Sequence, residues 1–196
     1  MDPVVAQDPV GYTDGGPEQA LKRAVRDYAT SRAELVEGII TLTLPSRAHQ
    51  KAVKLMRRQI MPCLAGLGLA PGTGYLDLPG SDNWFMPDLT VSSAGQAEEE
   101  RTPVTDRTLL VVEVTSSSSA ETDRVVKLRW YGRYKVPLYL LVDRQRRSCT
   151  VFSEPGKPGY EAVDGPHPFG TPIRLPAPFG LTLDTRVLPS VNRAAR

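Results

Sequence analysis

The sequence predicts an α/β fold in which helices flank a mixed central sheet. Its strongest strand signal is residues 109–115, an apolar run rich in valine, which is typical of a strand covered on both faces. Apolar residues recur at helical spacing before and after this run, over residues 47–64 and 120–135. Strands and helices arranged around one strong central strand are typical of α/β proteins.

The size and composition of the chain predict a single domain over residues 17–190. The sequence has 196 residues, of which 40% are hydrophobic and 23% charged, as in ordinary globular proteins. Residues 1–16 are rich in Asp, Pro and Gly without any period, so we expect a mobile tail there. A second tail is expected at 191–196.

The charge balance and the number of cysteines limit which partners and which cellular compartment we expect for the protein. Lys and Arg number 24 and Asp and Glu 22, so the net charge of +2 does not by itself indicate a nucleic-acid partner. Cys63 and Cys149 are too few for a zinc site and suit a reducing compartment. No run approaches the roughly 18 apolar residues of a membrane span, and the N-terminus lacks the features of a secretory signal. We therefore expect a cytoplasmic protein without a membrane segment.

The elements before the central strand are predicted from caps, turns and periodicity. Helical spacing predicts a helix over 17–33, and a turn at residues 37–38 indicates a hairpin over 34–44. Ser46 suits the N-cap position of the helix over 47–64. The other elements expected here are strands at 69–78 and 84–91 and a polar loop at 92–105.

The elements after the central strand continue the alternation of strand and helix. A serine run at 116–119 is short, so the helix over 120–135 must return beside the strand that it follows. Two further strands are expected at 137–142 and 148–152, joined by a basic turn. The remainder of the chain is rich in Pro and Gly with short apolar runs, which indicates edge strands and loops.

Glu113 is an anomaly within the central strand. Alternate residues of a strand share a face, so Glu113 lies on the face of Leu109, Val111 and Thr115. A carboxylate on a covered face costs several kcal/mol unless it is paired or binds a cation. The alternative is a frayed strand end at which Glu113 contacts water. We predict a functional carboxylate, because local rules fail mostly at functional sites.

Asp88 is a second candidate, at the start of the strand that precedes the central one. The dipeptide Pro87-Asp88 is also common in turns, and this is the simpler alternative. On a strand next to that of Glu113, however, Asp88 can face the same cavity as Glu113. Hard cations such as Mg²⁺ prefer oxygen ligands of this kind.

The helix over 120–135 carries a third set of candidates. Asp123, Lys127 and Tyr131 are spaced i, i+4, i+8 and therefore share one face. A surface Asp123–Lys127 pair is one interpretation, with a contribution of about 0.3–0.5 kcal/mol. The other is that Lys127 extends into the cavity of the two carboxylates, because the helix begins shortly after the strand of Glu113.

The helix over 47–64 adds polar residues with two possible interpretations. His49 and Gln50 begin it, and a lone histidine is more often structural than catalytic. Four basic residues follow that could contact phosphates, although a solvated helix face is the simpler interpretation: Lys51, Lys54, Arg57 and Arg58. The sequence has no Walker loop, no GxGxxG after a strand, no HExxH and no GxSxG, so those chemistries lack support.

Taken together, these residues resemble the Uma-two family of restriction endonucleases, within the PD-(D/E)XK nuclease superfamily. The resemblance covers about residues 34–152 and rests on the order and spacing of its parts. Those parts are Glu34 to Gly38, His49-Gln50, Pro87-Asp88, Glu113-Val114, Asp123…Lys127…Tyr131 and Val136-Pro137…Tyr139…Val142-Asp143. The fold that this resemblance implies is restriction-endonuclease-like.

The resemblance also implies roles for these residues. Asp88 and Glu113 are the expected metal-binding acids, and Lys127 the expected lysine, supplied from the helix because Val114 occupies the position that usually carries it. The accessory residues implied are an acid near the metal, two groups at the rim and two neighbours on the helix: Glu34, His49, Gln50, Asp123 and Tyr131.

The expected activity is Mg²⁺-dependent hydrolysis of DNA phosphodiester bonds, with Mn²⁺ as a possible substitute. A homodimer is expected, since an enzyme that cuts both strands usually has two-fold symmetry. Two alternatives stay open. One is a catalytically silent DNA-binding or regulatory protein with the same fold, and the other is a phosphodiesterase acting on RNA or nucleotides.

Overall fold

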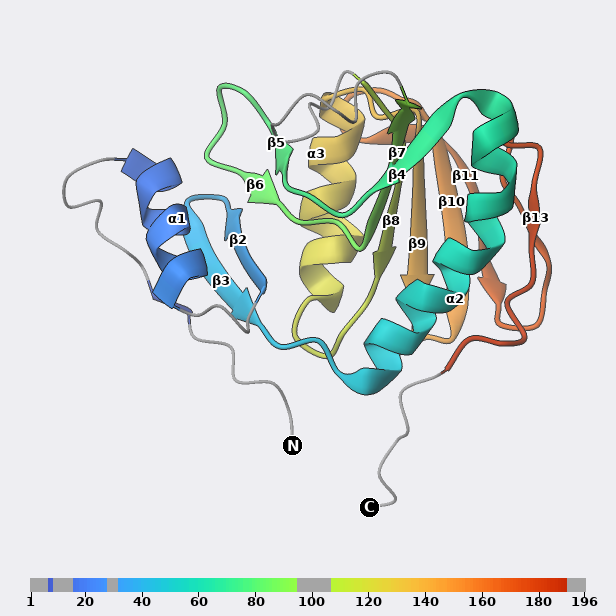
Figure 1. Cartoon of the computed structure of the whole chain (residues 1–196), viewed down its shortest axis with the longest axis horizontal. Helices are drawn as coiled ribbons and strands as arrows, with labels where there is room; N and C mark the ends of the chain where they lie inside the picture. The colour runs from blue at the N-terminus through green and yellow to red at the C-terminus, as the bar shows by residue number, and fades with distance from the viewer. Residues whose placement is uncertain (1–6, 9–15, 28–31, 95–106, 190–196) are drawn as a thin grey trace, which may run out of the picture.

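A six-stranded mixed sheet forms the centre of the molecule (Figure 1). The computed structural model describes residues 7–8, 16–27, 32–94 and 107–189. Within the sheet β8 and β9 are parallel and every other pair is antiparallel. In sheet order the strands are β11 (Tyr160–Pro168), β10 (Ser148–Pro155), β9 (Leu138–Asp143), β8 (Thr108–Val114), β7 (Leu89–Ser93) and β4 (Leu69–Gly72).

A helical connection links the two parallel strands across one face of this sheet. It begins at Ala120, is wound as a π-helix over Thr122–Lys127, and continues as α3 (Leu128–Arg133). The predicted helix is therefore present, with a π-helical first half and an end at Arg133. α3 packs closely, because a Cβ added at Gly132 would lie 2.0 Å from the carbonyl oxygen of Gly159.

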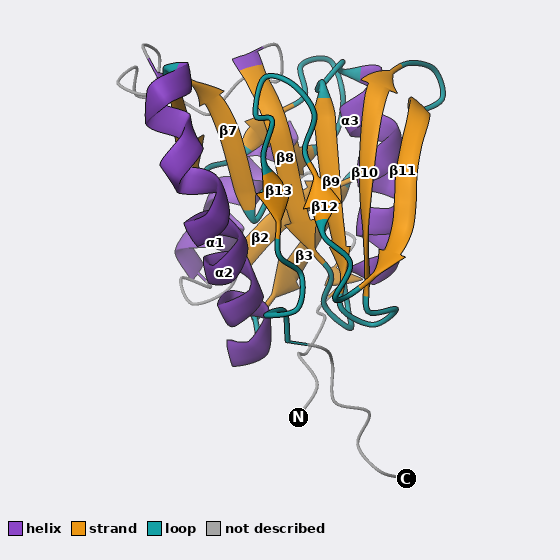
Figure 2. Cartoon of the chain, turned by 90° about the vertical axis from the view of Figure 1, so that its right-hand side faces the viewer, coloured by secondary structure: helices purple, strands orange, loops and turns teal. Residues whose placement is uncertain are grey.

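The opposite face of the sheet is covered by α2 (Arg47–Leu64) together with the small sheet of β12 (Ile173–Arg174) and β13 (Thr182–Leu183) (Figure 2). A short 3₁₀ turn, Ala65–Leu67, follows α2. The predicted bounds and cap of α2 are confirmed, since the Ser46 side chain accepts a hydrogen bond from the backbone N–H of His49 at 3.2 Å. Apolar side chains of α2 and of alternate sheet residues form the largest core cluster.

A second sheet lies beside α3 and carries the predicted hairpin (Figure 1). The hairpin turns at Glu37 and Gly38, which both have positive φ. α1 (Gly16–Asp27) covers this sheet and ends earlier than the predicted helix over 17–33, because Arg32 already belongs to a strand. The strands in sheet order are β1 (Gln7–Asp8), β3 (Ile39–Thr43), β2 (Arg32–Val36), β6 (Trp84–Phe85) and β5 (Leu76–Asp77).

The two strands predicted at 69–78 and 84–91 are each divided between the two sheets. β4 and β7 join the large sheet, whereas β5 and β6 join the second one. Pro87, which lacks a backbone N–H, separates β6 from β7 and lets the chain change sheets. The predicted α/β class, with its mixed sheet flanked by helices, is confirmed.

Several predictions concern segments at the limits of the described residues. Of the predicted N-terminal tail at 1–16, residues 7–8 form β1 and Gly16 begins α1, and the remainder lies outside the described residues. The predicted tail at 191–196 lies outside them, as does most of the loop at 92–105. None of the helices in the described part of the chain combines the length and hydropathy that crossing a membrane requires.

Candidate active site

Strand register brings Asp88 and Glu113 side by side. β7 and β8 are antiparallel with Leu89 opposite Val112, so Asp88, one residue before β7, lies opposite Glu113. Opposite residues of an antiparallel pair point to the same face. Leu89 and Val112 belong to the core under α2, so both carboxylates point to the other face, where α3 packs. Both are buried, with 6% and 2% exposure.

The two carboxylates line a pocket, which we call the acidic pocket, at the junction of the two sheets. Four of its residues are acidic and two are Lys or Arg, so its formal charge is −2 with its histidine neutral. Its lining residues come from both sheets, α2 and the helical connection: Arg32, Glu34, Thr43, Leu44, Pro45, His49, Asp88, Glu113, Val114, Ser116, Ser119, Asp123 and Lys127.

Lys127 lies at the centre of three of the carboxylates and is only 2% exposed. Its Nζ lies 2.9 Å from Glu34 Oε1, 3.0 Å from Glu113 Oε1 and 3.2 Å from Asp123 Oδ1. The surface-pair interpretation of Asp123 and Lys127 is therefore wrong, because both residues are buried and the lysine is shared by acids from three elements. Tyr131 donates a hydrogen bond from its hydroxyl to Glu113 Oε1 at 2.7 Å and so helps to fix the position of this carboxylate.

The helical connection fixes Asp123 and Lys127 in the pocket. Both lie in its π-helical part, Thr122–Lys127, and such segments occur frequently at functional sites. Ser119 donates its hydroxyl to Asp123 Oδ2 at 2.7 Å, and Tyr139 donates to the Asp123 carbonyl at 2.9 Å. The helix therefore starts on a hydrogen-bonded serine turn and is tied to β9.

Asp88 is held by a different set of donors. Its Oδ1 accepts hydrogen bonds from Arg32 and, at 3.0 Å, from His49 Nε2. Its Oδ2 accepts from the backbone N–H of Val114 at 2.8 Å. Arg32 also donates to the Met86 carbonyl, so the segment leading into Asp88 is fixed on its backbone as well.

The environment raises the pKa of one group of acids. Burial, supported by the neighbouring acids, raises the pKa of Glu113 to about 8 although Lys127 opposes the shift. Burial likewise raises the pKa of Asp123. For Lys127 burial acts to lower the pKa, but Glu113, Glu34 and Asp123 outweigh it and raise the pKa well above its ordinary value. The lysine is therefore a cation at neutral pH.

Asp88 shows the opposite behaviour. Burial would raise its pKa, but the hydrogen bond from His49 and the charge of Arg32 outweigh burial and lower the pKa to about 2. For Arg32 burial acts to lower the pKa, and Asp88, Glu34 and Glu113 together raise it. The pocket thus contains one carboxylate that stays ionised well into the acid range, Asp88, and two that take up a proton more readily than free acids, Glu113 and Asp123.

The stability of the metal-free protein should fall as the pH rises from about 4.5 to about 8. The folded protein binds a proton at Glu113 more tightly than the unfolded chain, whose ordinary pKa is 4.5, so this contribution is complete below pH 4.5 and is lost as the pH passes about 8. We expect the free energy of unfolding to fall by a few kcal/mol across this range. Asp88 does not contribute to this pH dependence, because its lowered pKa changes the stability only below about pH 4.

Denaturant unfolding in the presence of a chelator, at several pH values, measures this effect. Asp123 adds to the same slope, so Glu113→Gln should reduce the pH dependence without removing it. An equally steep dependence in Glu113→Gln would show that Glu113 is not its source.

The pocket suits a hard cation by its chemistry, although its acids are engaged by protein groups. No three His, Cys, Asp or Glu side chains converge as a ready metal site within the described ranges. Arg32 forms an ion pair with Asp88, and Lys127 forms one with Glu113, in the place that a metal ion would take. However, the donors are carboxylate oxygens, and the formal charge of the pocket is −2. Buried Asp123 Oδ1 accepts no hydrogen bond from the described residues, because its contact with Lys127 is not in hydrogen-bonding geometry. A divalent cation fits this donor set.

Of the eight residues predicted from the sequence, six line the acidic pocket: Glu34, His49, Asp88, Glu113, Asp123 and Lys127. Tyr131 lies behind Glu113, and Gln50 is exposed on α2 outside this pocket. Arg32 and Ser119 also line the pocket but were not among the residues predicted from the sequence. Arg32 precedes Glu34 by two residues and so shares its face of the strand, which is the signal that could have identified it.

The fold and this pocket define a restriction-endonuclease-like α/β protein. The structure is similar to that of a protein from Anabaena variabilis described as a "putative nuclease belonging to DUF820", with a TM-score of 0.64 and 15% identity over 80% of this chain and 88% of the other. The model of the Uma2 family, described as "Putative restriction endonuclease", matches residues 17–186. The chain therefore belongs to the Uma2 family, as its resemblance predicted. A comparison with curated proteins finds no match.

Proposed function

We propose that this protein is a Mg²⁺-dependent endonuclease of the PD-(D/E)XK type that hydrolyses phosphodiester bonds in DNA. The observation that carries the proposal is the buried juxtaposition of Asp88 and Glu113 on adjacent strands, with Lys127 3.0 Å from Glu113. Membership of the Uma2 family and the nuclease-like fold support the reaction class. The proposed setting is the cytoplasm, and the proposed assembly is a homodimer.

Asp88 and Glu113 are the proposed ligands of the metal ion. The ion, Mg²⁺ or in its place Mn²⁺, would polarise the phosphate and lower the pKa of a bound water. Asp88 is ionised at all relevant pH values and is ready to bind a cation once Arg32 releases it. With its pKa raised to about 8, Glu113 carries a proton in most metal-free molecules at neutral pH, so binding of the ion would displace that proton.

Lys127 is the proposed catalytic lysine. It is a fixed cation, buried and held by three carboxylates, so its position needs no reorganisation during the reaction. Such a charge stabilises the negative charge that develops on the phosphate in the transition state. Tyr131 and Asp123 are proposed to position Glu113 and Lys127, since their contacts fix these two side chains.

Glu34 and His49 are proposed to position Asp88. Glu34 Oε1 accepts a hydrogen bond from the backbone N–H of Met86 at 2.7 Å, two residues before Asp88. His49 Nε2 contacts Asp88 directly, while its buried Nδ1 has no hydrogen-bond partner in the part of the chain that the structure describes. His49 thus contacts the carboxylate of Asp88, whereas Glu34 fixes the backbone that leads into Asp88, so both residues are proposed to position the metal ligand.

A cleavage assay on supercoiled plasmid and single-stranded DNA tests the proposal. With Mg²⁺ or Mn²⁺ we expect nicked or linear product from the wild-type protein, no product with a chelator, and cleavage about 1,000-fold slower with Glu113→Gln. Cleavage of RNA or nucleotides alone would replace the proposal by the phosphodiesterase alternative. Binding of DNA without cleavage under either metal would support the silent alternative. Sedimentation of the protein with and without DNA tests the proposed homodimer.

A further inference from the structure

A second pocket, which we call the basic groove, lies along α2 next to the acidic pocket. The two pockets share the lining residues Arg32, Pro45, His49 and Asp88, so they adjoin at the candidate metal ligand. The residues that line the basic groove are Arg32, Pro45, His49, Gln50, Val53, Lys54, Arg57, Thr73, Met86, Pro87 and Asp88.

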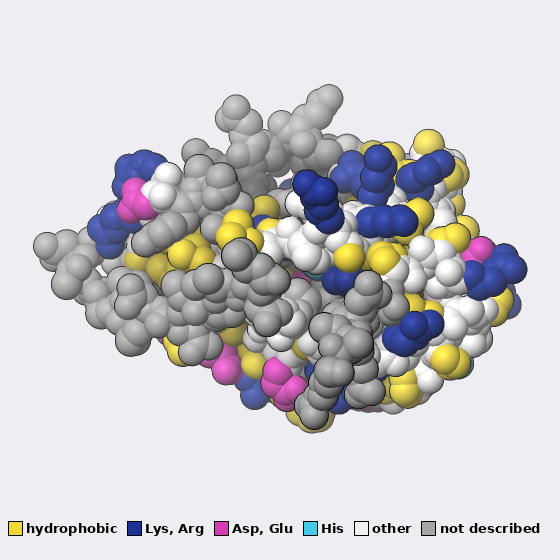
Figure 3. All heavy atoms as spheres, turned by 90° about the horizontal axis from the view of Figure 1, so that it is seen from below, with side chains coloured by type: hydrophobic (Ala, Val, Ile, Leu, Met, Phe, Trp, Pro, Cys, Tyr) yellow, Lys and Arg dark blue, Asp and Glu magenta, His cyan; other side chains and the backbone are white. Residues whose placement is uncertain are grey.

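One wall of the groove is a polar and basic stripe of α2. Gln50, Lys54 and Arg57 are spaced i, i+4, i+7 and therefore follow one side of the helix. Gln50 and Lys54 are exposed and Arg57 is half-buried. In the view from below, Lys and Arg side chains gather on the side of the molecule where α2 lies (Figure 3). The groove therefore presents cations to whatever enters it.

Asp88 is the one acidic residue among the lining residues of the groove, and it lies at the inner end. There it is already bound by Arg32 and His49. The opposite wall contributes the uncharged residues Met86 and Pro87 from the segment before β7. The groove thus has a net positive formal charge and adjoins an acidic pocket of formal charge −2, an arrangement that suits a polyanion whose one phosphate meets the metal site.

The stretch of α2 that lines the groove is long enough for more than one phosphate. His49 and Arg57 are eight residues apart, which corresponds to about 12 Å along α2. One strand of a DNA duplex carries a phosphate about every 3.4 Å of helix axis, so this length exceeds a single phosphate. The basic residues of α2 fall into two pairs: Lys54 and Arg57 line the groove, whereas Lys51 and Arg58 are exposed but do not line it.

We propose that the basic groove binds the phosphodiester backbone of the DNA strand on one side of the scissile phosphate, with Lys54 and Arg57 as the phosphate-contacting residues. This inference rests on the proposed nuclease function for the identity of the strand. It assigns a binding role to two cations that belong to no part of the acidic pocket. It also predicts that the strand leaves the site along α2.

The test is the salt dependence of DNA binding by the metal-free protein, which cannot cleave. A labelled duplex is titrated with wild-type protein, with Lys54→Gln/Arg57→Gln and with Lys51→Gln/Arg58→Gln, and fluorescence anisotropy is followed at several salt concentrations in a chelator. Each lost phosphate contact lowers the slope of log K against log salt by about 0.9. We expect a slope smaller by about 1.8 for Lys54→Gln/Arg57→Gln and an unchanged slope for the control pair, which loses the same charge from the same helix.

Three outcomes would overturn the groove: no binding of DNA by the wild-type protein, an equal fall of the slope in both double variants, or an unchanged slope in Lys54→Gln/Arg57→Gln. Circular dichroism checks that both variants fold, as expected for exposed or half-buried polar side chains. The cleavage assay separates the two proposals. If Lys54→Gln/Arg57→Gln selectively weakens DNA binding but the wild-type protein never cleaves DNA, the proposed role of the groove is supported and the proposed nuclease activity is contradicted. If Lys54→Gln/Arg57→Gln cleaves DNA with wild-type KM and kcat, the proposed nuclease activity is supported and the proposed role of the groove is contradicted.

Discussion

Replacing Glu113 with glutamine should lower the rate of DNA cleavage by about 1,000-fold, the equivalent of about 4 kcal/mol of transition-state stabilisation by the metal ion. The same change should raise the melting temperature of the metal-free protein. Glu113 is fully enclosed among other acids, which raises its pKa to about 8, so its ionised form destabilises the fold. Glutamine removes the charge and keeps the shape. The gain should be larger at pH 8.5 than at pH 6, where Glu113 already carries a proton.

Asp88→Asn is the matched comparison, since it makes the same chemical change in the opposite residue of the strand pair. Cleavage should again be lost, but stability should fall, because Asp88 is ionised in the fold and accepts hydrogen bonds from Arg32, His49 and Val114. The loss should be about 2 kcal/mol or more, since the half-buried Arg32 is left without its carboxylate. Thermal unfolding in a chelator measures both variants. A fall in melting temperature for Glu113→Gln would identify Glu113 as a structural partner of Lys127.

Lys127→Ala should lower the free energy of unfolding of the metal-free protein by about 3–5 kcal/mol, as expected when one partner of a buried ion pair is removed. The change leaves Glu34, Glu113 and Asp123 buried together without the cation that all three contact. Cleavage should also be lost, because the transition state loses a fixed positive charge. Mg²⁺ should restore part of the stability, since a bound divalent ion replaces the missing charge.

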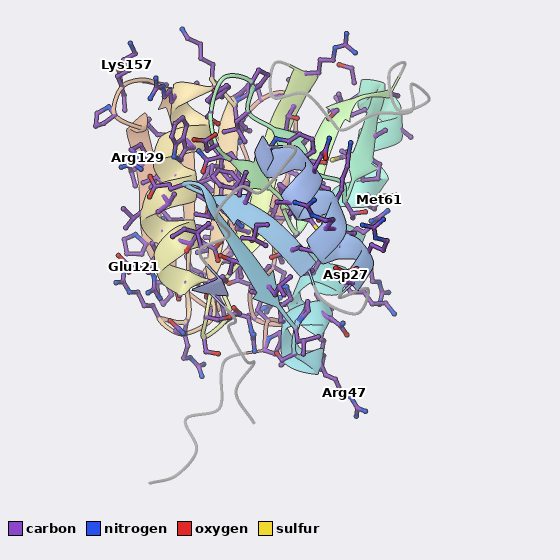
Figure 4. The ribbon with its side chains drawn as sticks, turned by 90° about the vertical axis from the view of Figure 1, so that its left-hand side faces the viewer. Asp27, Arg47, Met61, Glu121, Arg129 and Lys157 are labelled. Atoms are coloured by element: carbon purple, nitrogen blue, oxygen red, sulfur yellow. The ribbon has the colours of Figure 1, made fainter. Side chains whose placement is uncertain are left out.

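Arg129→Ala is the control on the same helix. Arg129 projects outward from α3 (Figure 4), and its ion pair with Glu37 is about half exposed on both sides. Its replacement should cost less than about 1 kcal/mol. Urea unfolding with and without Mg²⁺ compares the two variants. A cost for Lys127→Ala as small as that of Arg129→Ala, with cleavage retained, would return Lys127 to an ordinary ion-pair role.

The sequence alone determined the elements whose signals act over a few residues. The N-cap at Ser46 and the apolar spacing after it predicted α2 with its observed bounds, and the turn at residues 37–38 predicted the hairpin. Alternation within 109–115 placed Glu113 on a covered face, which marked it as a candidate before any neighbour was known. Caps, turns and periodicity depend on neighbouring residues, and therefore they can be seen in one chain.

Only the tertiary structure decided which side chains meet. Arg32 binds Asp88 across 56 residues of sequence, and no local pattern indicates that contact. The division of 69–91 between two sheets depends on which strand edges were free to pair, a property of the whole fold. The position of Lys127 among three acids, and of Lys54 in a groove that Lys51 does not reach, likewise follows from how helices dock on the sheet. Burial and long-range pairing set these charges in place, and both arise only when distant segments pack together.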